Sequence, residues 1–146
     1  EKYVLKGREN MKISIASDHG GFDLKEDLRA WLTGQGHEVV DFGCHGKESC
    51  DYPDFAGPAA RAAASGECER GIVICTTGIG VSMTALCADP WSAEMTRRHN
   101  DANVLAIGAG VTGPLLARQI VTAFLTHEFE GGRHQRRVDK VMSTEA

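Results

Sequence analysis

Three polar clusters interrupt the apolar runs of this sequence, and each offers groups that could carry chemistry. The first is 17–21, Ser-Asp-His-Gly-Gly, which directly follows the apolar run 12–17. A glycine pair before a helix lets the backbone approach an anion at the helix N-terminus. An ordinary Asp-containing turn with a surface histidine explains the same residues equally well.

The second cluster is 75–82, Cys-Thr-Thr-Gly-Ile-Gly-Val-Ser. A cysteine that ends a buried strand is usually a small core hydrophobe. Here the residues that follow it can form a nest of backbone N–H groups, suited to phosphate or a developing oxyanion. The same positive potential favours the thiolate of Cys75. Because neither a Walker A loop nor a complete GxGxxG is present, a nucleotide-binding module is only weakly supported.

The third cluster is 97–101, Arg-Arg-His-Asn-Asp, where an expected helix leads into the last expected strand. His99 is a candidate general acid/base or a C-terminal cap that faces the helix dipole, and taken alone the cap is favoured. Open α/β sheets bind ligands beyond the carboxyl ends of their strands. We therefore expect all three clusters at that edge of the sheet.

A fourth segment, 131–137, concentrates positive charge in an acidic protein. Arg133 and Arg137 are four residues apart and so share one helical face, where they could clamp a phosphate. A solvated charged face is the alternative. It explains the arginines less well because few acidic residues lie nearby in the sequence.

The composition is that of a soluble globular protein, with 42% hydrophobic and 25% charged residues among 146. The net charge of −4 makes nucleic acid a poor partner and a small molecule a better one. We find no apolar run of membrane-spanning length and no signal peptide. Five cysteines without CxxC spacing and no suitably spaced histidine pair predict neither a disulfide scaffold nor a metal site, in a reducing cytoplasm.

Strand-like and helical patterns alternate along the chain. The expected strands are Lys12–Ser17, Glu38–Phe42, Gly71–Thr76, Ala85–Ala88 and Asn103–Ile107. The expected helices are Phe22–Thr33, Phe55–Ala64, Ser92–His99 and Pro114–Thr126. This alternation predicts an α/β fold: one doubly wound, Rossmann-like domain over 11–146, with a five-stranded parallel sheet and helices on both faces. Residues 1–10 differ from the rest and are interpreted as a tag or other non-native extension.

One connection is too short for this pattern. Only Thr77–Thr84 joins the third and fourth expected strands. If these strands are parallel neighbours, the crossover between them needs at least ~10–12 residues. Either the chain is shortened here, or a segment after Met83 is missing from the sequence as written. The intact flanks favour the second interpretation.

Taken in order, the motifs closely resemble the ribose-5-phosphate isomerase B family, whose relatives act on galactose 6-phosphate or allose 6-phosphate. The matching stretches are SDHGGFDLKEDL at 17–28, DFG at 41–43, DYPDFA at 51–56, GIVICTTGIGVSM at 71–83, RRHNDANVLAIGA at 97–109 and FEGGRHQRRV at 129–138. The resemblance implies the same doubly wound fold and a cofactor-free enzyme. It also implies an intertwined homodimer, or a tetramer built from it, whose active sites take residues from both subunits.

The resemblance also implies roles for particular residues, with no metal among them. Cys75 is the base that moves a proton between C1 and C2 of the open-chain sugar, and a thiol can both take and return that proton. Thr77 and His99 match residues associated with opening the furanose ring. Gly78, Gly80 and Ser82 belong to the loop that cradles the enediolate. Sugar or phosphate contacts fall at Asp18, His19 and Tyr52, and contacts from the second subunit fall at Asn100, Arg133 and Arg137.

Three departures from the family pattern stand out. Thr76 replaces the usual glycine beside the base, and Gly110 replaces a usual phosphate-binding arginine, a loss of ~1.5–3 kcal/mol. Roughly nine residues resembling AANKxxGIR are absent between Met83 and Thr84, which is where the crossover is too short. We expect an aldose–ketose isomerase, with ribose 5-phosphate as the leading substrate. The alternatives are an allose or galactose 6-phosphate isomerase, and a catalytically weakened homologue that only binds the sugar phosphate.

Overall fold

The apolar runs of the sequence form one parallel sheet in the computed structural model, which describes residues 10–82 and 84–144. The strand order is β2-β1-β3-β5-β4, and every pairing is parallel. The strands are β1 (Lys12–Ser17), β2 (Glu38–Asp41), β3 (Arg70–Cys75), β4 (Ala85–Leu86) and β5 (Val104–Gly108). The predicted α/β fold class is confirmed.

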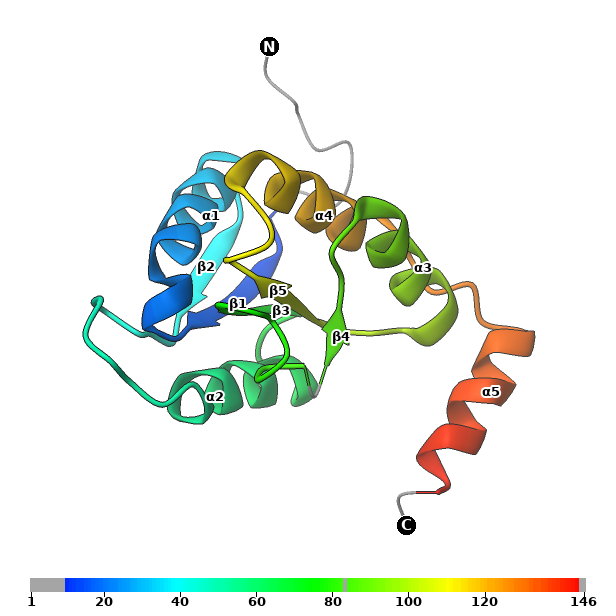
Figure 1. Cartoon of the computed structure of the whole chain (residues 1–146). Coiled ribbons are helices and arrows are strands. Elements are labelled where there is room, and N and C mark those ends of the chain that lie inside the picture. Colours follow the sequence, from blue (N-terminus) through cyan, green and yellow to red (C-terminus); the bar gives the residue numbers. More distant parts are fainter. Residues whose placement is uncertain (1–9, 83, 145–146) are drawn as a thin grey trace.

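The helices cover both faces of this sheet (Figure 1). They are the 3-10 turn η1 (His19–Gly21), α1 (Phe22–Gly34), α2 (Pro53–Ala64), α3 (Pro90–Asn100), α4 (Pro114–Thr126) and α5 (Arg133–Met142). Helix α4 has the predicted bounds, with Pro114 in its first turn. Helix α3 begins two residues earlier than predicted, because the Asp89 carboxylate caps it by accepting the N–H of Ser92.

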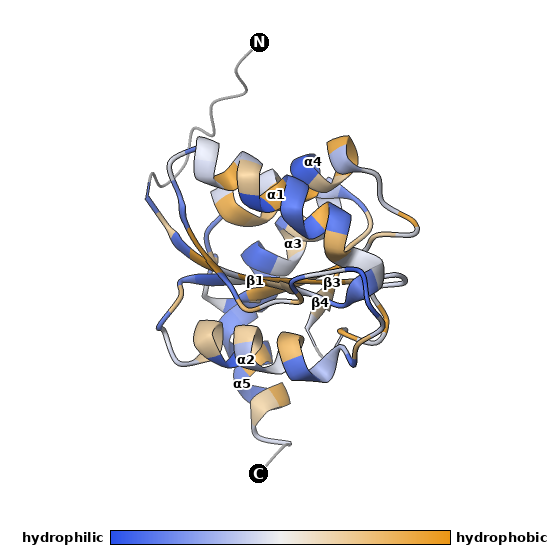
Figure 2. Cartoon of the chain, turned by 90° about the vertical axis from the view of Figure 1, so that its left-hand side faces the viewer, coloured by the Kyte–Doolittle hydropathy of each residue, from blue (hydrophilic) through white to orange (hydrophobic). Residues whose placement is uncertain are grey.

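The two faces of the sheet form separate cores. Ile72 and Ile74 of β3 point toward α1, α3 and α4, where they join the larger apolar cluster. Val73 and Cys75 point the other way, into a smaller cluster lined by alanines of α2. Figure 2 shows α1, α3 and α4 on one side of the sheet and α2 on the other. A strand that is buried on both faces reads as an unbroken apolar run, as β3 does.

The third and fourth strands are not neighbours, which corrects the premise behind the short crossover. Strand β5 lies between β3 and β4. The connection from Cys75 to Ala85 contains bends and turns but no helix among its described residues, and Met83 lies outside them. Strand β4 is also shorter than predicted, since only Ala85 and Leu86 pair with β5.

Helix α5 projects from the body of the molecule at the right of Figure 1, while the loop between β2 and α2 lies at the left. In its own chain α5 packs mainly against α3. The interpretation of residues 1–10 as an extension concerns, except for Asn10, residues outside those described. Within the described ranges, no helix is long and apolar enough to cross a membrane.

Candidate active site

The end of β1 is held between its two neighbouring strands, and this places the first polar cluster. The N–H of Ser17 donates to the carbonyl of Gly43 at 2.7 Å, and its carbonyl accepts the N–H of Cys44 at 2.8 Å. On the other side, the N–H of Asp18 donates to the Ile74 carbonyl at 3.2 Å. Asp18 and His19 therefore stand at the carboxyl edge of the sheet, next to the end of β3.

A buried lysine supports the same region. The side chain of Lys25 is fully buried and donates to the carboxylates of Glu26 at 2.8 Å and Asp41 at 2.7 Å. The other oxygen of Asp41 accepts the N–H of Gly43 at 2.9 Å. Lys25 thus reaches, through Asp41, the loop that pairs with Ser17. Sequence reasoning missed it because a lysine on an amphipathic helix is normally exposed.

Cys75 ends β3 with its thiol buried, at 4% exposure. Its Sγ accepts the backbone N–H of Gly78 at 3.1 Å. Gly78 has a φ of +78°, and a Cβ there would lie 2.9 Å from the backbone N of Gly108, so glycine alone fits. The sulfur therefore lies within hydrogen-bonding distance of a backbone N–H that is fixed in place by the loop.

The loop after Cys75 folds back on itself. The hydroxyl of Thr77 accepts the N–H of Ile79 at 3.2 Å, and Ser82 donates to the Ile79 carbonyl from both its N–H and its hydroxyl. Gly80 lies against the ring of Tyr52, since a Cβ on Gly80 would come within 3.0 Å of that ring. The structure therefore brings Thr77, Gly80, Ser82 and Tyr52 together in and beside the loop that follows Cys75.

His19 lies beside this group with a defined hydrogen-bonding pattern. Its Nδ1 accepts the N–H of Cys50 at 3.3 Å, which leaves Nε2 to carry the proton as a donor. The Cys50 thiol is 3.9 Å from the same Nδ1. Burial, together with the neighbouring Cys44, raises the pKa of Cys50. That thiol is therefore less suited to base chemistry near neutral pH.

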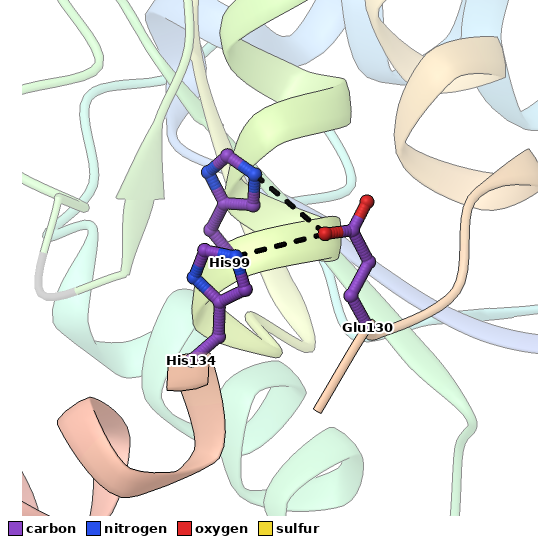
Figure 3. A group of neighbouring side chains, drawn as sticks. All are labelled: His99, Glu130 and His134. Atoms are coloured by element: carbon purple, nitrogen blue, oxygen red, sulfur yellow. Dashed lines mark ion pairs between the residues drawn. The ribbon is translucent and has the colours of Figure 1, made fainter. Parts of the chain in front are cut away.

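A second group of side chains forms around His99 at the end of α3 (Figure 3). The rings of His99 and His134 stack with centroids 4.1 Å apart and planes 7° from parallel. Glu130 faces both rings, 3.9 Å from Nε2 of His99 and 3.6 Å from Nε2 of His134. Arg98 donates to Glu130 and lowers the pKa of that carboxyl. Burial lowers the pKa of His134 and so favours its neutral form.

These three side chains offer the atoms of a metal site but not its geometry. The donor atoms of His99, Glu130 and His134 lie within 4.8 Å of one another. Imidazole nitrogens bind an ion that lies in the plane of the ring, and two parallel stacked rings cannot share such a position. An ion would also compete with the Arg98 guanidinium for Glu130. The cluster is better described as a charge-paired histidine stack.

The structure does not bring all the predicted site residues together in one chain. Helix α3 ends at Asn100, just before the amino end of β5, whereas Cys75 lies opposite Gly108 at the carboxyl end of β5. The expectation that the third cluster lies at the carboxyl edge is therefore wrong. A helix that follows one parallel strand must return to the amino edge before the next strand begins. His99 and Asn100 consequently lie at the amino edge of the sheet, whereas Cys75 lies at its carboxyl edge.

The basic segment belongs to this second group. Arg133 and Arg137 are exposed on α5, and within residues 10–82 and 84–144 neither forms an ion pair with a carboxylate. Helix α5 confirms that they share one helical face. Sequence reasoning missed Glu130 and His134 as partners of His99. Both lie inside the stretch 129–138, and their presence beside the arginines was the available signal.

The family described as Ribose/Galactose Isomerase matches residues 13–141, so the chain belongs to that family. A solved relative, ribose-5-phosphate isomerase B from Clostridium thermocellum, is 51% identical with a TM-score of 0.90, covering 92% of this chain and 97% of its own. The Thermotoga maritima ribose 5-phosphate isomerase structure is 43% identical with a TM-score of 0.87, covering 90% and 97%.

Among characterised sequences, ribose-5-phosphate isomerase B of Escherichia coli is 45% identical over 143 residues, covering 92% of this chain and 96% of the relative. This alignment of 143 positions is longer than the 92% of the 146-residue chain that it covers. The E. coli protein therefore contains residues that have no counterpart here.

Proposed function

We propose that this chain is a cofactor-independent aldose–ketose isomerase that interconverts ribose 5-phosphate and ribulose 5-phosphate. Family membership supports the reaction class. The relatives named ribose-5-phosphate isomerase B support ribose 5-phosphate as the substrate. The observation that carries the proposal is the Cys75 sulfur, which ends a central strand and accepts the Gly78 N–H. The five free cysteines fit a reducing cytoplasm.

Cys75 acts on the open-chain sugar. Its thiolate removes the proton from C2. The electrons of that C–H bond form the C1–C2 double bond while the π electrons of the C1 carbonyl move to O1, which gives an enediolate. The thiol then returns the proton to C1 as a proton passes from O2 to O1, so that the aldose becomes a ketose with no net gain or loss of electrons. Backbone donors of the loop 78–82 stabilise the charge on the enediolate oxygen. Asp18, His19 and Tyr52 hold the sugar and its hydroxyl groups beside the base.

The complete site is shared between two copies of the chain. Within one chain, the whole of β5 separates the Cys75 group from the His99 group, about 13 Å at roughly 3.3 Å per residue. Arg133 and Arg137 extend away from the body on α5, which also exposes Val141 and Met142. A second copy that docks against this arm would bring His99, Asn100, Arg133 and Arg137 to its own Cys75 group. His99 and Thr77 then open the furanose ring, and the two arginines bind the phosphate.

Replacing Cys75 with Ala tests the base. In deuterium oxide, the wild-type chain should exchange the C2 proton of ribose 5-phosphate, and C75A should not, while still binding the sugar phosphate. Cys68→Ala, a buried cysteine after α2, is the matched control and should retain exchange. Unchanged turnover in C75A would refute the assignment. Binding without turnover in the wild-type chain would instead identify a weakened homologue.

Subunit mixing tests the shared site. Neither C75A nor Arg137→Ala should be fully active alone, but a mixed dimer contains one site with both residues intact. Random mixing should therefore restore about a quarter of wild-type activity, because half the dimers are mixed and each has one working site of two. Mixed dimers without recovered activity, or a monomer by light scattering, would contradict this arrangement.

A further inference from the structure

Thr76 occupies an unusual position beside the base. Strand β3 ends at Cys75, and Thr76 is the first residue of the bend that follows it. It is exposed at the carboxyl edge, between the loop after β1 and the loop after β5. A Cβ on Gly20 would lie 2.1 Å from Thr76 Oγ1, and a Cβ on Gly110 would lie 3.2 Å from Thr76 Cγ2. The threonine side chain is thus wedged between two glycines.

Backbone hydrogen bonding and close packing hold Thr76 in this position. The N–H of Gly110 donates to the Thr76 carbonyl at 2.8 Å, which ties the β5 loop to the residue after the base. A Cβ on Gly110 would also come within 2.9 Å of that carbonyl oxygen. A larger residue at position 110 therefore has no room beside Thr76. The space between the two loops is filled by the hydroxyl and methyl groups of Thr76.

We infer that Thr76 is a specificity-determining residue that limits the length of the sugar phosphate, so that five-carbon aldose phosphates are preferred over six-carbon ones. The inference rests on the proposed function. With the reacting carbons at Cys75 and His19 among the proposed sugar contacts, the rest of the substrate extends along the carboxyl edge past Thr76, which lies between Gly20 and Gly110. An additional carbon pushes the phosphate end further along this edge, into the space that Thr76 fills.

The size of the effect follows from steric selection. A difference of one carbon in a fitted pocket changes relative kcat/KM by about 10–200-fold. Removing the side chain in Thr76→Gly should therefore raise the ratio of kcat/KM for allose 6-phosphate to that for ribose 5-phosphate at least about tenfold. This ratio is insensitive to a general loss of activity, because such a loss affects both substrates equally.

Two further variants separate bulk from hydrogen bonding. Thr76→Val keeps the branched shape without the hydroxyl, so its ratio should match that of the wild-type chain. Thr76→Ser keeps the hydroxyl without the methyl, so its ratio should fall between those of the wild type and T76G. Thermal melting of each variant checks that the fold is kept. If T76G does not fold, the serine variant still gives the direction of the change.

The outcomes are distinct. A ratio in T76G and T76S that stays within about twofold of wild type, well below the steric range, overturns the inference while leaving the isomerase proposal intact. A shift in T76V as large as that in T76G also overturns it, because the hydroxyl would then be the determinant. A wild-type chain that turns over neither sugar phosphate refutes the proposed function, and the inference fails with it.

Discussion

Replacing Lys25 with Met removes the buried charge that supports, through Asp41, the loop paired with Ser17. Lys25 is completely buried, whereas its partners Glu26 and Asp41 have side chains 33% and 18% exposed. Deleting one member of a fully buried pair costs about 3–5 kcal/mol. Here the remaining carboxylates reach solvent, and Asp41 keeps the Gly43 N–H. We therefore expect a loss at or below the lower limit of that range, about 2–3 kcal/mol, or about 4–12 °C in Tm.

Guanidinium unfolding monitored by circular dichroism measures this loss, and Lys12→Met is the matched control. Lys12 also lies near a carboxylate, 3.8 Å from Glu38, but both side chains are exposed. Its loss should cost under about 1 kcal/mol. Combining K25M with Asp41→Asn should cost less than the sum of the two single changes, because the residues are coupled. If K25M is no less stable than K12M, Lys25 does not support the loop as argued.

Arg137→Ala should raise KM for ribose 5-phosphate more than it lowers kcat, because the phosphate is bound about equally tightly in the ground state and in the transition state. Arg136→Ala is the control. If steady-state kinetics show equal effects for the two variants, Arg137 does not bind the phosphate. The pKa of Glu26 is lowered to about 2, first by Arg29 and then by Lys25, so its ion pairs stabilise the fold above pH 4.5 and this contribution is lost as pH falls toward 2. Glu26→Gln should therefore flatten the acid limb of Tm against pH, and an unchanged limb would exclude this contribution. Gly110→Ala should lower Tm by contact with Thr76, and adding Thr76→Gly should recover part of the loss; equal losses in both backgrounds would show that the methyl contact is unimportant. If the chain is truly shortened after Met83, trypsin should release Gly71–Arg97 as one peptide. If a segment after Met83 is missing from the sequence as written, mass spectrometry should instead find a heavier peptide or two peptides in its place.

The elements of the fold were predictable because their signals are local. Apolar spacing and Pro114 define α4 to the residue, and the apolar run of β3 defines a strand buried on both faces. Strand β4 was predicted too long because its pairing depends on β5, which lies elsewhere in the sequence. That partner choice is a tertiary property that no local pattern encodes.

The site was predicted residue by residue but not in its arrangement. The Cys75 loop assembles as its sequence indicates, because its hydrogen bonds are made within a few residues. The His99 cluster depends on Glu130 and His134, which are more than thirty residues away. Glu130 comes close because its N–H donates to the Arg98 carbonyl, and His134 because α5 packs on α3. The separation of His99 from Cys75 follows from the direction of α3. The return rule for parallel strands made that separation predictable in principle.

The order of the strands also determines how the molecule opens. Strand β3 has hydrogen-bonded neighbours on both sides, while β4, one of the two edge strands, consists of two residues, with Leu86 exposed. Local openings with the lowest free energy begin where few backbone bonds and little apolar area hold an element in place. Amide hydrogens at Ala85 and Leu86 should therefore exchange with solvent long before those of Ile72–Ile74. Fluctuations at the β4 edge can thus occur while Cys75 stays anchored to the part of the sheet that opens last.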